Sequence, residues 1–171
     1  MNIRAISLAA ALLATASLPK LASAQNSAVV QNRGPIWVSV PTSPASLETI
    51  TAKAPAKGYF IVTTTGSFIY EHDEGTQGWF CLALSPVAGN TGACVPDSGS
   101  DSAVRADISA NEPSTVPGFG ATTPYSIVRT YPVIAGDTYT FHLNGNATGF
   151  TGAYLFQPSI TVLYVPNLLA E

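Results

Sequence analysis

The stretch "YPVIAGDTYTFHLNGNATGFTGAYLFQPSITVLYVP", residues 131–166, decides the fold that we predict for this chain. Within it, Tyr139, Phe141 and Leu143 alternate with Thr138, Thr140 and His142 after a Gly-Asp turn. An alternation with a period of two is typical of a strand that buries one of its faces. The whole stretch therefore predicts three strands joined by turns rich in glycine and asparagine.

The strongest strand pattern upstream is "GYFIVTTTGSFIYE", residues 58–71. It is rich in β-branched and aromatic residues on both faces, with Phe60, Val62 and Phe68 on one face and Tyr59, Ile61 and Ile69 on the other. Gly66 is expected to bend or bulge it. A strand that is apolar on both faces lies either at the centre of a sandwich or under a second subunit.

The remaining segments also favour strands and turns. Shorter strands are predicted at residues 36–40, 47–54 and 79–85, in "YSIVRTYPV", and at 103–109, where Arg105 and Asp107 suit an edge strand. Residues 111–124 hold three prolines and two glycines and predict a long loop. We find no internal repeat and no helical periodicity outside the first 24 residues. The predicted fold is an all-β antiparallel sandwich, most simply a jelly roll of eight to ten strands.

Residues 1–24 have the three regions of a secretory signal peptide: Arg4, an apolar run, and a small-residue cleavage pattern ending at Ala24. The apolar run of about 14 residues is shorter than the roughly 20 that span a bilayer. After this leader helix we expect a flexible arm at 25–34 and one domain at 35–171 with no membrane span. The predicted location is secreted, periplasmic or at the cell surface.

Charge excludes some partner classes. Five basic side chains remain after the leader against ten acidic ones, with no basic patch, so nucleic acid and anionic membranes are not expected partners. Cys81 and Cys94 predict one structural disulfide, as is usual for two cysteines in an exported chain. Closing that loop would stabilise the fold by roughly 3 kcal/mol.

Two motifs in the deciding stretch carry a family resemblance. "YPVIAGDTYTFHL" resembles the Gly-Asp turn and alternating strand of the jelly-roll heads of the complement-component and tumour-necrosis-factor superfamily, and "GFTGAYLF" resembles their penultimate Phe-x-Gly strand. "NGNATG" stands where that family has a variable loop, and "APAKGYFIVTTTGSFIY" is similar to its early strand. The chain departs from the family by adding "QPSITVLYVP", a further strand, and by lacking a collagen-like stalk. The resemblance implies a ten-strand jelly roll that often forms trimers and binds proteins or glycans through its loops.

Two clusters are weak candidates for a metal. His72 and Asp73 lie among further carboxylates in "YEHDEG", and Asp97 and Asp101 flank a glycine in "PDSGSDS". Carboxylate oxygens suit hard divalent cations. However, a solvated turn and a flexible loop explain the two patterns more simply, so we expect no metal and no cofactor.

No catalytic constellation is visible. Neither His72 nor His142 stands in a triad context, no G-x-S-x-G elbow occurs, and His142 should point outward from its strand. Asn146 begins a possible glycosylation sequon. We therefore predict a chain that is not an enzyme.

Aromatic residues leave a binding function open. Most of them should be core, but a sugar-stacking platform or a subunit interface could use some of Trp37, Trp79, Tyr59, Tyr154 and Tyr164. Since "GYFIV" and "ITVLYV" are apolar on both faces, we expect self-association or contact with another extracellular protein. The alternatives are a pilin-like subunit that accepts a strand from a neighbour, and a carbohydrate- or ligand-binding module.

Overall fold

The computed structural model describes residues 29–94, 103–115 and 120–166. Apart from one short 3-10 turn, η1 (Gly92–Cys94), the regular elements in these residues are all strands. They are β1 (Val29–Arg33), β2 (Trp37–Ser39), β3 (Ala45–Lys53), β4 (Gly58–Glu71), β5 (Gly78–Ser85), β6 (Ala103–Ile108), β7 (Ala121–Val133), β8 (Thr138–Thr148) and β9 (Gly152–Pro166). The leader predicted at residues 1–24 lies outside the described residues.

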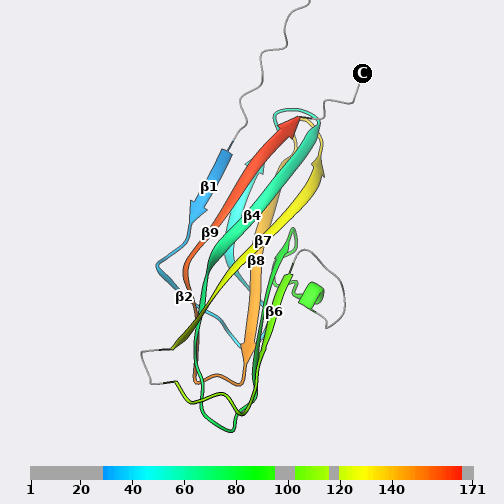
Figure 1. The fold of residues 1–171 in the computed structure, drawn as a ribbon. Helices are drawn as coiled ribbons and strands as arrows, with labels where there is room; N and C mark the ends of the chain where they lie inside the picture. The colour runs from blue at the N-terminus through cyan, green and yellow to red at the C-terminus, as the bar shows by residue number, and fades with distance from the viewer. Residues whose placement is uncertain (1–28, 95–102, 116–119, 167–171) are drawn as a thin grey trace, which may run out of the picture.

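The strands form two antiparallel sheets packed face to face (Figure 1). Sheet A has the order β1-β9-β4-β7, and β2 pairs with β9 beyond the end of β1. Sheet B has the order β3-β8-β5-β6. From β3 onward the chain passes repeatedly from one sheet to the other, and this strand order is that of a jelly roll. The predicted all-β sandwich is confirmed, with β4 at the centre of sheet A and β6 at an edge of sheet B.

The core lies between the two sheets and follows the predicted alternation. Phe60, Val62 and Phe68 of β4 all point inward and are buried. Phe68 stacks on Phe80 of sheet B, with ring centroids 3.8 Å apart. Tyr164 is also buried, and its hydroxyl donates to the Lys57 carbonyl at 3.1 Å. Large side chains thus fill the space between the layers, as a sandwich of this size requires.

A bulge in β9 corrects the predicted strand count. The segments read as two strands, "GFTGAYLF" and "QPSITVLYVP", form the single strand β9 after its turn. Opposite Gly66 the register of β9 against β4 shifts by one residue, and Gln157 adopts a positive φ of 49°. Because of the extra residue, the inward-facing positions change from odd-numbered residues such as Leu155 before the bulge to even-numbered residues such as Ile160 after it. The break in alternation therefore makes one strand look like two in the sequence. The irregularity predicted at Gly66 is confirmed.

The prediction of a loop at "NGNATG" is wrong. Residues up to Thr148 belong to β8, and Asn144, Gly145 and Asn146 are buried within it. Asn144 is tolerated in this strand because its side chain hydrogen-bonds to the backbone of Val87, Gly89 and Asn90, in the covering segment that follows β5 (residues 86–94). The sequon at Asn146 is therefore buried.

The prediction of a flexible arm at residues 25–34 is wrong for residues 29–33, which form a strand. Val29–Arg33 forms β1, paired with residues 159–163 of β9. The polar sequence suggested a loose segment, but an edge strand needs only backbone partners and may carry polar side chains. The sandwich therefore begins before residue 35.

Candidate binding face on the outer side of sheet A

The outer face of sheet B is covered by its own chain. Cys81, Ala83 and Cys94 form a small buried cluster apart from the main core, and the predicted Cys81–Cys94 disulfide is confirmed, with Cα atoms 5.8 Å apart. Asn144 fastens the same covering segment. Its amide accepts from the Gly89 N–H at 2.8 Å and donates to the carbonyls of Val87 and Asn90. This segment buries much of β5 and β8 from outside.

The rest of that face is polar and internally hydrogen-bonded. His142 Nδ1 lies 3.0 Å from the Ser46 hydroxyl and 3.1 Å from that of Thr49, and the hydroxyls of Thr51 and Thr140 pair at 3.1 Å. His142 therefore sits on the outer face, as its alternation predicted. At the edge, Arg105 pairs with Asp107 at 2.8 Å and lies over the ring of Trp79.

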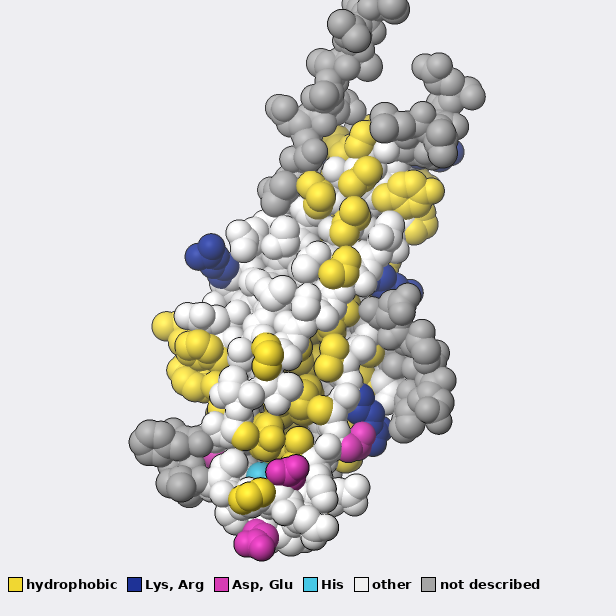
Figure 2. All heavy atoms as spheres, viewed as in Figure 1, with side chains coloured by type: hydrophobic (Ala, Val, Ile, Leu, Met, Phe, Trp, Pro, Cys, Tyr) yellow, Lys and Arg dark blue, Asp and Glu magenta, His cyan; other side chains and the backbone are white. Residues whose placement is uncertain are grey.

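The outer face of sheet A has an apolar end built by the register of β4 and β9. Tyr59 stands opposite Val165 and Ile61 opposite Leu163, and these four side chains point away from the core. Tyr59 is 40% exposed. Figure 2 shows hydrophobic side chains gathered at the upper end of this face, where β4 begins and β9 ends. We call these four residues the apolar end.

A band of small polar side chains follows the apolar end. Thr63 stands opposite Thr161 and Thr65 opposite Ser159, whose hydroxyls are 3.0 Å apart. Side chains of this kind satisfy one another across neighbouring strands. The band separates the apolar end from two hollows farther along β9.

The first hollow is an aromatic pocket of about 350 Å³, lined by Trp37, Ile69, Glu71, Gly120 and Tyr154. Trp37 is 53% exposed and Tyr154 37%. The Trp37 ring lies edge-on to Tyr154, with centroids 6.2 Å apart, and 5.0 Å from Phe156. One carboxylate, that of Glu71, stands in this otherwise apolar wall.

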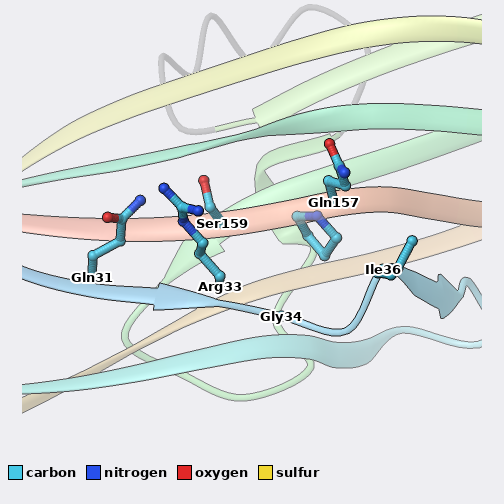
Figure 3. Close-up of a pocket in the computed structure, with 7 residues that line it drawn as sticks. Gln31, Arg33, Gly34, Ile36, Gln157 and Ser159 are labelled. Carbon is cyan, nitrogen blue, oxygen red and sulfur yellow. The ribbon is translucent and has the colours of Figure 1, made fainter.

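The second hollow is a polar pocket of about 470 Å³ beside the β9 bulge, lined by Gln31, Arg33, Gly34, Ile36, Gln157, Pro158 and Ser159. Figure 3 shows Gln31, Arg33, Gln157 and Ser159 projecting from β1 and β9 on the same side. The bulge shapes it, because Gln157 N–H donates to the Ile36 carbonyl and Gly34 N–H to the Pro158 carbonyl. This pocket was not predicted, and the break in the alternation of β9 at Gln157 is the one sign of it in the sequence.

A buried carboxylate lies next to the polar pocket. Glu48 of β3 is 8% exposed and accepts a hydrogen bond from the Asn32 side chain at 2.5 Å. Burial raises the pKa of Glu48, which hydrogen bonds from Thr49 and Asn32 offset in part. Gly34 leaves room for it, since a Cβ there would collide with the Glu48 carboxylate. This contact ties β1 of sheet A to β3 of sheet B.

The weak metal candidates do not come together in the described residues. A solvated turn was expected at His72, and this expectation is wrong. The side chain is only 1% exposed, and its Nε2 pairs with the Thr76 carbonyl. Its backbone N–H donates to the Thr115 hydroxyl at 2.6 Å, which draws the turn inward. Asp73 is exposed. Asp97 and Asp101 lie outside the described residues, and no group of three possible metal ligands occurs in those described.

The five aromatic residues of the predicted platform lie in four separate places. Trp37 and Tyr154 share the aromatic pocket, and Tyr59 belongs to the apolar end. Trp79 lies on sheet B and Tyr164 in the core. Ile69, Glu71 and Gly120 were not predicted as site residues, because only pairing between distant strands brings them to Trp37.

No helix within the described ranges is both long and apolar enough to cross a membrane. No protein-family model matches the sequence, and no curated protein matches it either.

Several solved structures share the fold at low identity. Eiger TNF from S. frugiperda is 12% identical, covering 85% of this chain and 95% of that one, with a TM-score of 0.42. A chain of the infectious bursal disease virus Gx strain is 13% identical, covering 94% of this chain and 36% of that one, with a TM-score of 0.44. Dimeric latent PorU from Porphyromonas gingivalis is 11% identical, covering 81% and 12%, with a TM-score of 0.41. The resemblance to complement and tumour-necrosis-factor heads holds for the jelly roll; family membership stays a prediction.

Proposed function

We propose that this protein is an exported, non-enzymatic jelly-roll domain that associates with further copies of itself through the apolar end of sheet A. Export is supported by the signal peptide pattern of residues 1–24 and agrees with a disulfide, which persists in oxidising compartments. Contact without turnover is the proposed mode of action.

The apolar end is the observation that carries this proposal. Register places Tyr59, Ile61, Leu163 and Val165 side by side on the outer face, where they add nothing to the core between the sheets. A contiguous apolar patch that remains on a folded chain usually marks a contact with another molecule. Self-association would explain why β4 and β9 carry apolar residues on both faces.

The surroundings of the patch favour a second copy as its occupant. Beside it stand uncharged residues: Thr63 and Thr161 on β4 and β9, and Thr130 and Pro132 on β7. A two-fold interface buries the same patch on both copies, so an unpaired charge in it would be desolvated twice. A patch whose strand neighbours are uncharged avoids that cost.

The histidines support binding rather than nucleophilic hydrolysis. A triad needs an imidazole whose second nitrogen is held by a buried acid. His142 Nδ1 instead lies beside the hydroxyls of Ser46 and Thr49, and His72 is buried against the Thr76 carbonyl. Both arrangements suit structural roles.

The pilin-like alternative is not favoured by the fold. A sandwich that awaits a donated strand should have an open groove along one sheet. In the described residues β9 is paired on both sides, and its own inward-facing residues Leu155 and Ile160 are fully buried. The core at this position is already closed.

The test is the molar mass of the purified chain over a concentration series, by sedimentation velocity. We expect a reversible oligomer in the wild type and a monomer in Ile61→Lys. The matched control is Thr51→Lys, an exposed threonine on the outer face of sheet B, which should associate like the wild type. A wild-type monomer at every concentration, or equal loss in both variants, would overturn the proposal and leave a different protein as the occupant.

A further inference from the structure

We infer that the aromatic pocket formed by Trp37, Ile69, Glu71 and Tyr154 binds a neutral carbohydrate. The pocket residues Ile69 and Glu71 lie about eight to twelve residues along β4 from Tyr59 and Ile61 of the apolar end, or roughly 25–40 Å at the usual rise of a strand. This site therefore goes beyond the proposed self-association and can be tested apart from it.

The Trp37 side chain is held ready for a ligand. Its ring lies beside those of Phe156 and Tyr154, with centroids 5.0 and 6.2 Å away, and 53% of the residue is still exposed to solvent. An aromatic ring that is fixed by neighbours loses little conformational entropy when it binds. A core tryptophan would be covered, and an unsupported surface tryptophan would be free to move.

The chemistry of the walls fits an amphipathic ring. Trp37, Tyr154 and Ile69 offer apolar surface, which matches the C–H face of a sugar. Glu71 adds a carboxylate, which accepts hydrogen bonds from hydroxyl groups and is a strong acceptor when ionised. Apolar walls with a few placed polar groups are characteristic of small-molecule sites, and about 350 Å³ falls within their usual size.

Two glycines keep the pocket open. A Cβ at Gly152 would lie 3.0 Å from the Tyr154 ring and 3.1 Å from Glu71 Oε2. A Cβ at Gly120 would lie 2.4 Å from the Tyr70 carbonyl. The missing side chain at Gly152 leaves room for the Tyr154 ring and the Glu71 carboxylate, and the one at Gly120 lets the backbone there approach β4 closely.

Charge selects a neutral ligand over an anionic one. The carboxylate of Glu71 is the charged group that lines the pocket, with no lysine or arginine among the described residues of its wall. An acidic sugar would meet like charge there, and a protein with ten acidic side chains offers it little long-range attraction.

The polar pocket extends the site to a chain of sugars. It flanks the same part of β9, and its wall includes Ile36, the residue before Trp37. Gln31, Gln157 and Ser159 supply amide and hydroxyl groups that both donate and accept hydrogen bonds, and Arg33 adds N–H donors. The one guanidinium of this pocket balances the one carboxylate of the aromatic pocket, so the lining of the two pockets together carries no net charge and still suits a neutral ligand. A ligand longer than one ring would therefore contact both pockets.

Tryptophan fluorescence gives a direct test, because the chain holds only Trp37 and Trp79. In Trp79→Phe, Trp37 is the single tryptophan and reports on its own pocket. We would titrate this full-length variant with cellohexaose, xylohexaose and mannohexaose as neutral ligands, and with hexagalacturonic acid as the anionic control. We expect a saturable change with at least one neutral ligand and at least tenfold weaker binding of the anionic one.

Two further variants assign the residues, with affinity measured by calorimetry. Trp37→Ala should weaken binding by at least about tenfold, or about 1.4 kcal/mol. Glu71→Gln keeps the shape of the side chain and should weaken binding severalfold. The matched control is Tyr59→Ala at the apolar end, which should bind sugar as the wild type does.

Four results would overturn the inference: no response to any of the neutral ligands, equal or tighter binding of hexagalacturonic acid, unchanged affinity in Trp37→Ala, or unchanged affinity in Glu71→Gln. Failure of self-association would leave this test untouched, since it concerns the other end of the face. A change in Trp37 fluorescence that follows protein concentration when no sugar is added would show that the pocket contacts a second copy instead of a sugar.

Discussion

The outer faces of the two sheets are built in opposite ways. On sheet B the chain folds back over its own strands, held by the Cys81–Cys94 disulfide and by Asn144, and the rest carries paired hydroxyls. On sheet A the described chain leaves Tyr59 and Trp37 exposed, at 40% and 53%. The contrast teaches that the chain itself covers and stabilises one face, whereas the other keeps apolar and aromatic side chains at the surface, where we propose that contacts with other molecules form.

Removing the disulfide should break this contrast most strongly. In Cys81→Ser/Cys94→Ser we expect the free energy of unfolding to fall by roughly 3 kcal/mol, because the unfolded chain regains the entropy of the open loop. Urea unfolding followed by circular dichroism measures it. An equal stability with and without the bond would mean that the covering segment of sheet B is held by its hydrogen bonds alone.

Asn144→Ala tests those hydrogen bonds. The buried amide contacts Val87, Gly89 and Asn90, so we expect a loss of about 2 kcal/mol as its backbone partners lose their bonds. Thr140→Ala on the same face of β8 is the control and should cost at most about 0.5 kcal/mol. If both changes cost the same, Asn144 does not hold the covering segment.

Glu48→Gln probes the junction between the two sheets. Burial raises the pKa of Glu48, so the folded chain holds this proton more tightly than the unfolded chain does. Its contribution to stability is therefore present below the ordinary pKa of a glutamate and is lost as pH rises through the folded pKa. The variant lacks this loss and should be more stable than the wild type at neutral pH, by on the order of 1 kcal/mol.

The measurement for Glu48 is urea unfolding of both proteins at several values between about pH 4 and pH 7. The difference in stability should grow with pH. Glu74→Gln, at an exposed position, controls for the removal of one charge. A difference that stays constant across this range would show that the carboxylate is no harder to ionise in the folded state.

Changes on the outer face of sheet A should affect stability least. Ile61→Thr keeps a β-branched side chain and should alter the free energy of unfolding by less than about 1 kcal/mol while it weakens self-association. Thr63→Ile extends the same apolar strip and should strengthen self-association. The two dissociation constants, measured by sedimentation, should move in opposite directions; movement in the same direction would place the interface elsewhere.

The sequence predicted most strands because their alternation is local. Phe60, Val62 and Phe68 point inward as expected, and the edge position of β6 followed from Arg105 and Asp107. Prediction failed where a partner from a distant part of the chain changed a segment. Residues 29–33 became a strand by pairing with β9, and His72 was drawn inward by Thr76 and Thr115.

The candidate site was only partly predictable for the same reason. Trp37 and Tyr154 belong to the five aromatics predicted as candidates for a sugar-stacking platform or a subunit interface. Their meeting with Glu71 depends on β2 and β4 both pairing with β9, which joins residues far apart in the sequence. The polar pocket depends on the bulge at Gln157.

By itself, the sequence determined that this chain forms strands, that its two cysteines pair, and which side chains of β4 share a face. The strands and their shared faces follow from an alternation with a period of two, which is visible within a few residues of sequence. Only the tertiary structure decided which of the two-faced strands keep an apolar face uncovered and which polar segments are buried. That outcome rests on register between distant strands and on where the chain folds back over a sheet, and neither is written in any local pattern.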